Sequence, residues 1–197
     1  MKANRTLILN TLLIFILLVS CKKEENNPTP TPQPIPTIAI GDSYQGGKIA
    51  YILQWYDSGY DANVPHGLIA APFDQGTAQW GCYGTLISDA DGTAIGTGAL
   101  NTIDIMNGCS TAGIAARLCS DLSLNGYTDW YLPSKDELNQ LYINRVAIGG
   151  FATYLYWSST EGPNDYGEDA WIQTFTSGEQ DASSKGGTAR VRAVRSF

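Results

Sequence analysis

A proline-rich run divides this chain and limits where a globular fold can form. Residues 26–36 (NNPTPTPQPIP) carry a proline at every second position from Pro28 to Pro36. Such a run favours an extended polyproline II chain without internal hydrogen bonds. Only residues 38–197 are then left for packing, and a segment of about 160 residues suffices for one domain that buries roughly 70% of its surface. We expect a single globular domain.

The segment before the prolines has the three parts of an export signal. Basic Lys2 and Arg5 precede an apolar run over residues 7–19, and small Ser20 follows it. The run is shorter than the about 20 apolar residues that a membrane-spanning helix needs. Residues 18–21 (LVSC) resemble the lipobox of bacterial lipoproteins, which implies cleavage before Cys21 and a diacylated Cys21 thiol. The alternative is an ordinary secretory peptide, residues 1–20, followed by a chance cysteine.

The residues after Cys21 indicate where such a lipoprotein would be displayed. Residues 22–25 (KKEE) are similar to the basic-then-acidic signal that sends some lipoproteins to the outer face of the outer membrane. The alternative is a solvated charge cluster. Residues 21–37 would then be a lipidated, semi-rigid tether, at about 3.1 Å per residue where it is polyproline II. We expect an outer-membrane lipoprotein at the cell surface, held on the membrane by its N-terminal lipid.

The charge balance excludes one class of partner. The chain has 12 basic and 19 acidic residues, and removing Lys2 and Arg5 with the leader leaves 10 against 19, a net charge of −9. Binding to nucleic acid or to sulfated polysaccharide needs a basic field. We therefore expect no nucleic-acid partner.

Three cysteines follow the anchor, and their spacing favours one disulfide. Cys109 and Cys119 flank a stretch that reads as helical, and about ten residues of helix at about 1.5 Å each would hold them too far apart to bond. Cys82 and Cys109 both lie in expected loops, so we predict that they pair and that Cys119 is a buried thiol. His66 is the only histidine and lies at an expected turn, and we expect it to be structural or solvent-facing rather than a zinc ligand or catalytic base.

The local patterns predict short strands and helices. Aromatic or β-branched runs bounded by glycine and proline predict strands at residues 47–54, 67–71, 154–159, 170–176 and 189–196. A first helix is expected from Asn101 or Thr102 to Met106, and a second from Ser110 or Thr111 to residue 122. A third begins at Ser134, which forms a capping box with Glu137. We expect an α+β domain with short helices packed on twisted antiparallel sheet.

Four motifs in the second half of the chain resemble the Lcl C-terminal domain family, long described as a domain of unknown function. The motifs are residues 126–138 (GYTDWYLPSKDEL), 156–161 (YWSSTE), 170–171 (AW) and 191–195 (VRAVR). The resemblance covers about residues 40–197 and implies a C-type-lectin-like fold and a surface-exposed binding role. The family's namesake is a collagen-like adhesin that binds glycosaminoglycans. This chain lacks the collagen-like repeat, has Tyr131 where members usually have Arg, and has Ala193 where many have Cys.

The shared motif residues are expected to hold the fold together. Asp129 can pair with an arginine of the last strand, and at least one of Arg192 and Arg195 should form a partly buried ion pair. Large apolar side chains suited to the core are Trp130, Trp157 and Trp171.

One loop collects oxygen-bearing side chains suited to a ligand or to calcium. Its candidate residues are Glu161, Asn164, Asp165, Tyr166, Glu168 and Asp169. C-type lectins use Glu, Asn and Asp of neighbouring loops to bind calcium and sugar, and Tyr166 could stack on a sugar. A plain solvated acidic loop is the other interpretation.

These observations predict a non-catalytic binding or adhesion module for a glycan or protein ligand, with no catalytic residue and no cofactor apart from the calcium that the acidic loop could hold. One alternative is a carbohydrate-active hydrolase that pairs Glu161 with Asp165 or Glu168. Another is a structural protein of the envelope.

Overall fold

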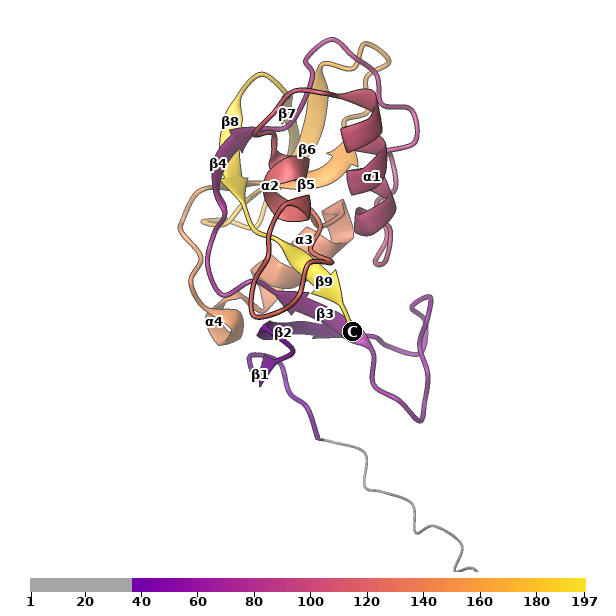
Figure 1. Ribbon diagram of the computed structural model, residues 1–197, viewed down its shortest axis with the longest axis vertical. Helices are drawn as coiled ribbons and strands as arrows, with labels where there is room; N and C mark the ends of the chain where they lie inside the picture. Colours follow the sequence, from indigo (N-terminus) through magenta and orange to yellow (C-terminus); the bar gives the residue numbers. More distant parts are fainter. Residues whose placement is uncertain (1–36) are drawn as a thin grey trace, which may run out of the picture. The chain divides into compact units, whose positions relative to one another are not determined.

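Two β-sheets form the framework of the domain (Figure 1). The structure is a computed structural model that describes residues 37–197. The first sheet has the order β1-β2-β3-β9, and its strands are β1 (Ser43–Tyr44), β2 (Gly47–Ile52), β3 (Gly67–Ala70) and β9 (Val194–Ser196). The second has the order β4-β8-β5-β6-β7, with β4 (Gly76–Gln79), β8 (Thr188–Val191), β5 (Leu155–Glu161), β6 (Asp169–Thr174) and β7 (Gln180–Ser184). All pairings are antiparallel except β5 with β8.

The last predicted strand, residues 189–196, is two strands. The chain leaves the second sheet after Val191, passes through Arg192 and Ala193, and enters the first sheet at Val194 (Figure 1). The crossing is fixed on both sides, because Ala71 N–H donates to Ala193 O at 2.9 Å and Gln75 N–H donates to Val191 O at 2.9 Å. This segment therefore joins the two sheets.

Four helices lie in the described residues, and only one begins as the sequence predicts. Helix α3 (Lys135–Ile143) starts with the expected capping box of Ser134 and Glu137, which is confirmed. The others are α1 (Gly98–Gly108), α2 (Ala115–Ser120) and the short α4 (Arg145–Ile148).

The predicted starts of the first two helices are wrong for identifiable reasons. Helix α1 begins before Asn101, whose buried side chain instead donates to Gly92 O at 2.7 Å. Gly113 adopts a left-handed conformation with φ of 71°, and Ile114 is extended. That turn separates Ser110 and Thr111 from α2, so neither residue caps it.

The core consists of two clusters of buried side chains, one of which contains Trp80, Trp130, Trp157 and Cys119. The other surrounds Tyr156 and Phe175. Trp171 does not join either cluster, contrary to expectation. Successive residues of a strand face opposite sides, so the buried Ala170 and Ile172 point inward and Trp171 lies half-buried on the other face. The Lys135 ammonium lies 3.5 Å from the centre of its ring.

The described part of the chain is thus an α+β domain of two sheets with short helices. Within it, no helix has both the length and the apolar character needed to cross a membrane. The predicted signal peptide (1–20), Cys21, the residue 22–25 signal and the run at 26–36 lie outside the described residues.

Candidate functional site

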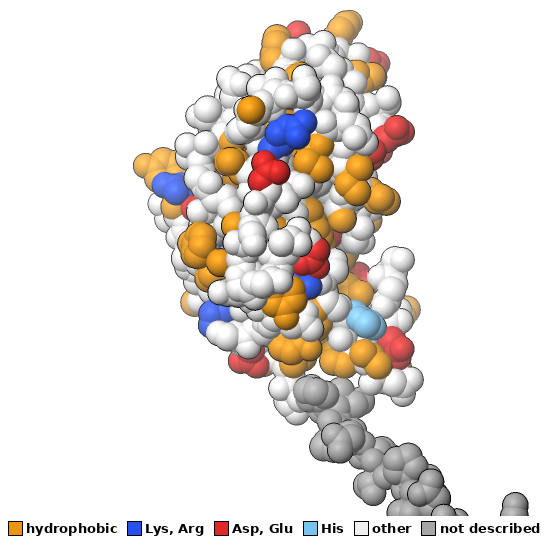
Figure 2. All heavy atoms as spheres, in the orientation of Figure 1, with side chains coloured by type: hydrophobic (Ala, Val, Ile, Leu, Met, Phe, Trp, Pro, Cys, Tyr) orange, Lys and Arg blue, Asp and Glu red, His pale blue; other side chains and the backbone are white. Residues whose placement is uncertain are grey.

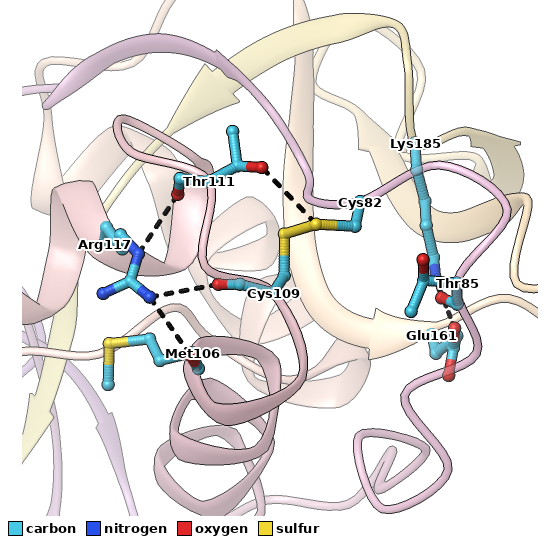
Figure 3. Close-up of a disulfide and its surroundings, with 8 residues drawn as sticks. All are labelled: Cys82, Thr85, Met106, Cys109, Thr111, Arg117, Glu161 and Lys185. Atoms are coloured by element: carbon cyan, nitrogen blue, oxygen red, sulfur yellow. Dashed lines mark hydrogen bonds and ion pairs between the residues drawn. A yellow bond between two sulfur atoms is a disulfide. The ribbon is translucent and has the colours of Figure 1, made fainter.

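Glu161, the first residue of the expected ligand loop, is committed to an internal ion pair (Figure 3). It ends β5 with 4% of its side chain exposed, and its carboxylate accepts the Ile87 N–H at 2.9 Å and pairs with the Lys185 ammonium. Lys185 is fully buried and also donates to Thr85 O at 2.9 Å. Glu161 therefore fastens the segment around residues 85–87 to the end of β7 and does not face solvent.

The other residues of this loop bond mainly to one another. Asn164 donates to the Asp169 carboxylate at 2.5 Å and accepts the Tyr166 N–H at 3.1 Å. Glu168 accepts the hydroxyl of Tyr83 at 3.0 Å, which raises the pKa of that tyrosine. Asp165 and Tyr166 are exposed. Asn164 thus braces the loop from within.

The expected calcium site and the carboxylate pair of a hydrolase both stay predictions. Among residues 37–197, no three Asp, Glu, His or Cys side chains lie close enough together to hold a metal ion. Calcium takes six to eight oxygen ligands. Glu161, the shared member of both predicted hydrolase pairs, is sequestered by Lys185. The candidate residues that the loop exposes to solvent are Asp165 and Tyr166.

The motif arginines form ion pairs with different degrees of burial. Arg195 is bidentate to Asp129, with both N···O distances 2.8 Å, and this contact holds the pKa of Asp129 below its usual value. Arg192 is fully buried, and its Nε and Nη2 groups both donate to Asp74 Oδ1, at 2.8 and 2.6 Å. Sequence reasoning missed Asp74, which follows β3 and belongs to none of the four motifs.

The motifs also meet through the backbone. Tyr131 and Val194 exchange two hydrogen bonds of 2.8 and 2.9 Å, and Ser159 N–H donates to Pro133 O at 2.7 Å. Ser158 Oγ also donates to Trp171 O at 2.9 Å, so all four motifs are direct neighbours and support the fold.

Cys109 follows the last turn of α1 as its C-cap and lies against Cys82 (Figure 3). Cys82 and Cys109 are joined by a disulfide, and Cys119 is a free thiol in the core whose pKa is raised by burial. The Arg117 guanidinium donates to the carbonyls of Met106, Cys109 and Thr111 at 3.0–3.1 Å. It thereby holds the segment that carries Cys109 against α2.

A second loop, between β2 and β3, displays Trp55, the most exposed aromatic side chain of the described domain. We call residues 53–66 the aromatic loop; it projects away from the sheet in Figure 1. Trp55 is 79% exposed and Tyr56 is 67% exposed, and their rings meet edge to face with centroids 5.4 Å apart. Tyr60 and Val64 are also exposed. Most of this segment lies between the predicted strands 47–54 and 67–71, and its density of aromatic residues is a signal that the sequence offers.

The aromatic loop is held by defined hydrogen bonds. The Asp57 carboxylate accepts the Gln54 N–H and the Tyr51 hydroxyl, each at 2.7 Å. The base of the loop is closed by Leu53 N–H, which donates to His66 O at 2.8 Å. His66 itself is half-buried, and its Nδ1 lies 3.1 Å from Phe197 O. The exposed rings are therefore carried by a loop whose backbone is held by hydrogen bonds.

Comparison with known proteins assigns the domain. The family model of the Lcl C-terminal domain matches residues 53–195. The chain belongs to this family. No curated protein matches the chain. The Lcl C-terminal domain thus spans all four sequence motifs and begins at the first residue of the aromatic loop, so the buried motif network and the exposed rings are both parts of it.

Proposed function

We propose that this member of the Lcl C-terminal domain family is a lipid-anchored, surface-displayed binding module without catalytic activity. Its ligand is a glycan or a protein, and the contact is made by the aromatic loop. The observation that carries the proposal is the exposure of Trp55 and Tyr56 on a loop ordered by Asp57. The C-type-lectin-like plan is part of the proposal, and family membership supports it.

Exposed Trp and Tyr side chains on an ordered loop are well suited to binding. Both combine a large apolar surface with a polar group, and both are enriched among residues that dominate binding energy. Ordering the loop in advance reduces the conformational entropy lost when a ligand binds. The hydrogen bonds to Asp57 and the closure between Leu53 and His66 supply that order.

The state of the charged residues supports binding over catalysis. Glu161 is paired with Lys185, Asp74 with two arginines, and Asp129 with Arg195. Each has a partner that explains its position in the fold. The hydrolase alternative depends on Glu161, which the ion pair keeps from substrate.

The membrane anchor is supported by the leader, the LVSC sequence that ends at Cys21, and the KKEE sequence after it. Two or three acyl chains bind a membrane far more firmly than one. The proline-rich tether would hold the domain away from the bilayer, which suits the capture of ligands outside the outer membrane.

The experiment is a retention screen of the purified full chain on immobilised glycans and extracellular-matrix proteins, with and without calcium. We expect retention by the wild type and by Tyr166→Ala, and loss of retention when Trp55→Ala and Tyr56→Ala are combined. Tyr166 is a matched control because it is 76% exposed in the other candidate loop. Calcium-dependent retention that Tyr166→Ala abolishes would instead place ligand binding in the acidic loop, residues 161–169. Release of shortened glycan would show a hydrolase.

A further inference from the structure

We infer that the aromatic loop takes an uncharged, hydroxyl-rich glycan, with the face of a sugar ring stacked on Trp55. The inference rests on the proposed function of this loop and narrows it to one class of ligand.

The arrangement of the rings favours a flat ligand. Trp55 and Tyr56 meet edge to face at an interplanar angle of 80°. The contact covers only part of each ring, and the rest of the ring surface stays accessible to a ligand. Trp55 keeps 79% of its surface accessible. The negative face of an aromatic ring attracts the polarised C–H groups that line one side of a sugar ring.

Polar groups that suit hydroxyls stand close in sequence to these rings. Asp61 and Asn63 are both exposed, and the Asp61 carboxylate accepts the Asn63 N–H at 2.7 Å. The Asp61 carboxylate is ionised at neutral pH, and the bond from this N–H lowers its pKa further. A carboxylate accepts hydrogen bonds and an amide both donates and accepts, which is the complement of vicinal hydroxyls.

The charge of the loop excludes acidic glycans. Residues 53–66 contain Asp57 and Asp61 but neither Lys nor Arg. The part of the chain after the leader has a net charge of −9, from 10 basic and 19 acidic residues. The face drawn in Figure 2 shows basic side chains singly rather than in a patch. A sulfated or uronic-acid chain would therefore be repelled where it approaches Trp55.

A protein partner could also use exposed Trp and Tyr, and Tyr60 and Val64 add apolar surface to the same loop. The loop also carries the exposed Asp61 and Asn63, whose hydrogen-bonding groups fit a sugar surface better than the desolvated core of a protein interface.

The test is affinity electrophoresis of the purified full chain in detergent, through gels that contain one polysaccharide each. The uncharged probes are mannan, xylan, starch and galactan; the acidic probes are heparan sulfate, chondroitin sulfate and polygalacturonate. We expect at least one uncharged probe to retard the wild type equally at about 0.05 and about 0.5 M NaCl, because salt screens only charge interactions. We expect no retardation by the acidic probes.

The variants assign the effect to the loop. Trp55→Ala should weaken the retardation at least about tenfold, in line with loss of a dominant aromatic contact. Trp55→Phe should restore part of it, because an aromatic face remains. Tyr154→Ala, at a side chain 63% exposed outside the aromatic loop, should leave it unchanged. Thermal unfolding of each variant checks that the fold is intact.

The contrary results separate the inference from the proposed function. Retention by acidic probes or by matrix protein alone, lost in Trp55→Ala, would overturn the uncharged-glycan inference and leave the binding role of the loop standing. Retention that is indifferent to Trp55→Ala, or no retention by any glycan or matrix protein, would overturn both.

Discussion

Asp74 holds more of the structure than any other single carboxylate described above. It accepts from Arg192 at 2.6 and 2.8 Å, from Arg190 at 3.1 Å and from the Tyr156 hydroxyl at 2.9 Å. Arg192 lies between β8 and β9, where the chain changes sheets. Asp74 therefore stabilises the point at which the two sheets are joined.

Replacing Asp74 by Asn should destabilise the domain far more than the same change at Asp129. The Asp74 side chain is 10% exposed and its partner Arg192 is fully buried, whereas Asp129 is 57% exposed. Removing one partner of a buried pair costs about 3–5 kcal/mol. In the Asp129 pair Arg195 is buried but the carboxylate is largely exposed, so solvent screens the contact and its loss should cost less, about 1 kcal/mol. Urea unfolding of the two variants measures the difference; equal losses would contradict the assigned burial.

Glu137 introduces a pH dependence in the physiological range. Burial raises the pKa of its carboxyl from 4.5 to about 7, although the N–H groups of Ser134 and Gly96 lower it in part. The folded state therefore holds this proton more tightly than the unfolded state does. Its contribution to stability is fully present below about pH 4.5 and is lost as the pH rises through about 7.

Glu137→Gln should remove this component. We expect the wild type to lose more stability than the variant between about pH 5 and about pH 7.5, because Gln does not titrate. Urea midpoints at the two pH values, compared between the two proteins, measure it. Parallel pH profiles would show that Glu137 keeps an ordinary pKa.

At this scale the sequence indicates which residues pair but not always with whom. Two arginines in an apolar strand required ion pairs, and Asp129 was identifiable from its motif. Asp74 lies 118 positions before Arg192, and no local pattern links them. Trp171 is expected in the core because its side chain is apolar. Strand alternation instead places Ala170 and Ile172 on the face of β6 that packs in the core.

Among the elements, α1 and the turn after β4 are tied together by the disulfide of Cys82 and Cys109, which are 27 positions apart. Closing a loop of that length reduces the entropy of the unfolded chain, by about 3–4 kcal/mol in the loop-closure model. We expect Cys82→Ser combined with Cys109→Ser to lower the free energy of unfolding by that amount, measured in urea.

Cys119 should behave differently from the disulfide cysteines. It is buried in the core, and burial raises its thiol pKa, so the reactive thiolate is scarce. Without reductant, iodoacetamide should leave the native soluble domain unlabelled. After unfolding it should add one label, at Cys119. Labelling of the native protein at a similar rate would place Cys119 at the surface.

Elements with weak patterns were the ones that the sequence did not reveal. Strands β4 (GTAQ) and β7 (QDASS) lie at the two edges of the second sheet and carry few apolar residues. An edge strand needs less apolar surface than a central one, so its alternation is faint. By contrast, the capping box of α3 is a local signal and predicted the helix start to the residue.

For the whole molecule, the anchor is tested by changing one atom. Cys21→Ser removes the thiol that would carry the lipid, so we expect the protein to leave the membrane fraction and to lose acyl label. Cys119→Ser is the matched control and should remain membrane-bound. A Cys21→Ser protein that stays in the membrane fraction would contradict lipid anchoring.

The two candidate loops show what sequence can predict about a site. The acidic loop drew attention because its residue types are those of calcium and sugar sites, yet Glu161 pairs with a lysine 24 positions away. The sequence does not mark the aromatic loop as a site, because exposure of Trp55 depends on how residues 53–66 leave the sheet. In both loops, distant packing decides which side chains reach solvent.

The most direct test of the central claim is capture without turnover. The purified full chain and the Trp55→Ala, Tyr56→Ala double variant are passed over immobilised glycans and matrix proteins. The size of the immobilised ligand is then measured. The account predicts that the wild type is captured, that the double variant is not, and that the ligand is recovered unchanged. Equal capture of both proteins, or recovery of a shortened ligand, would contradict it.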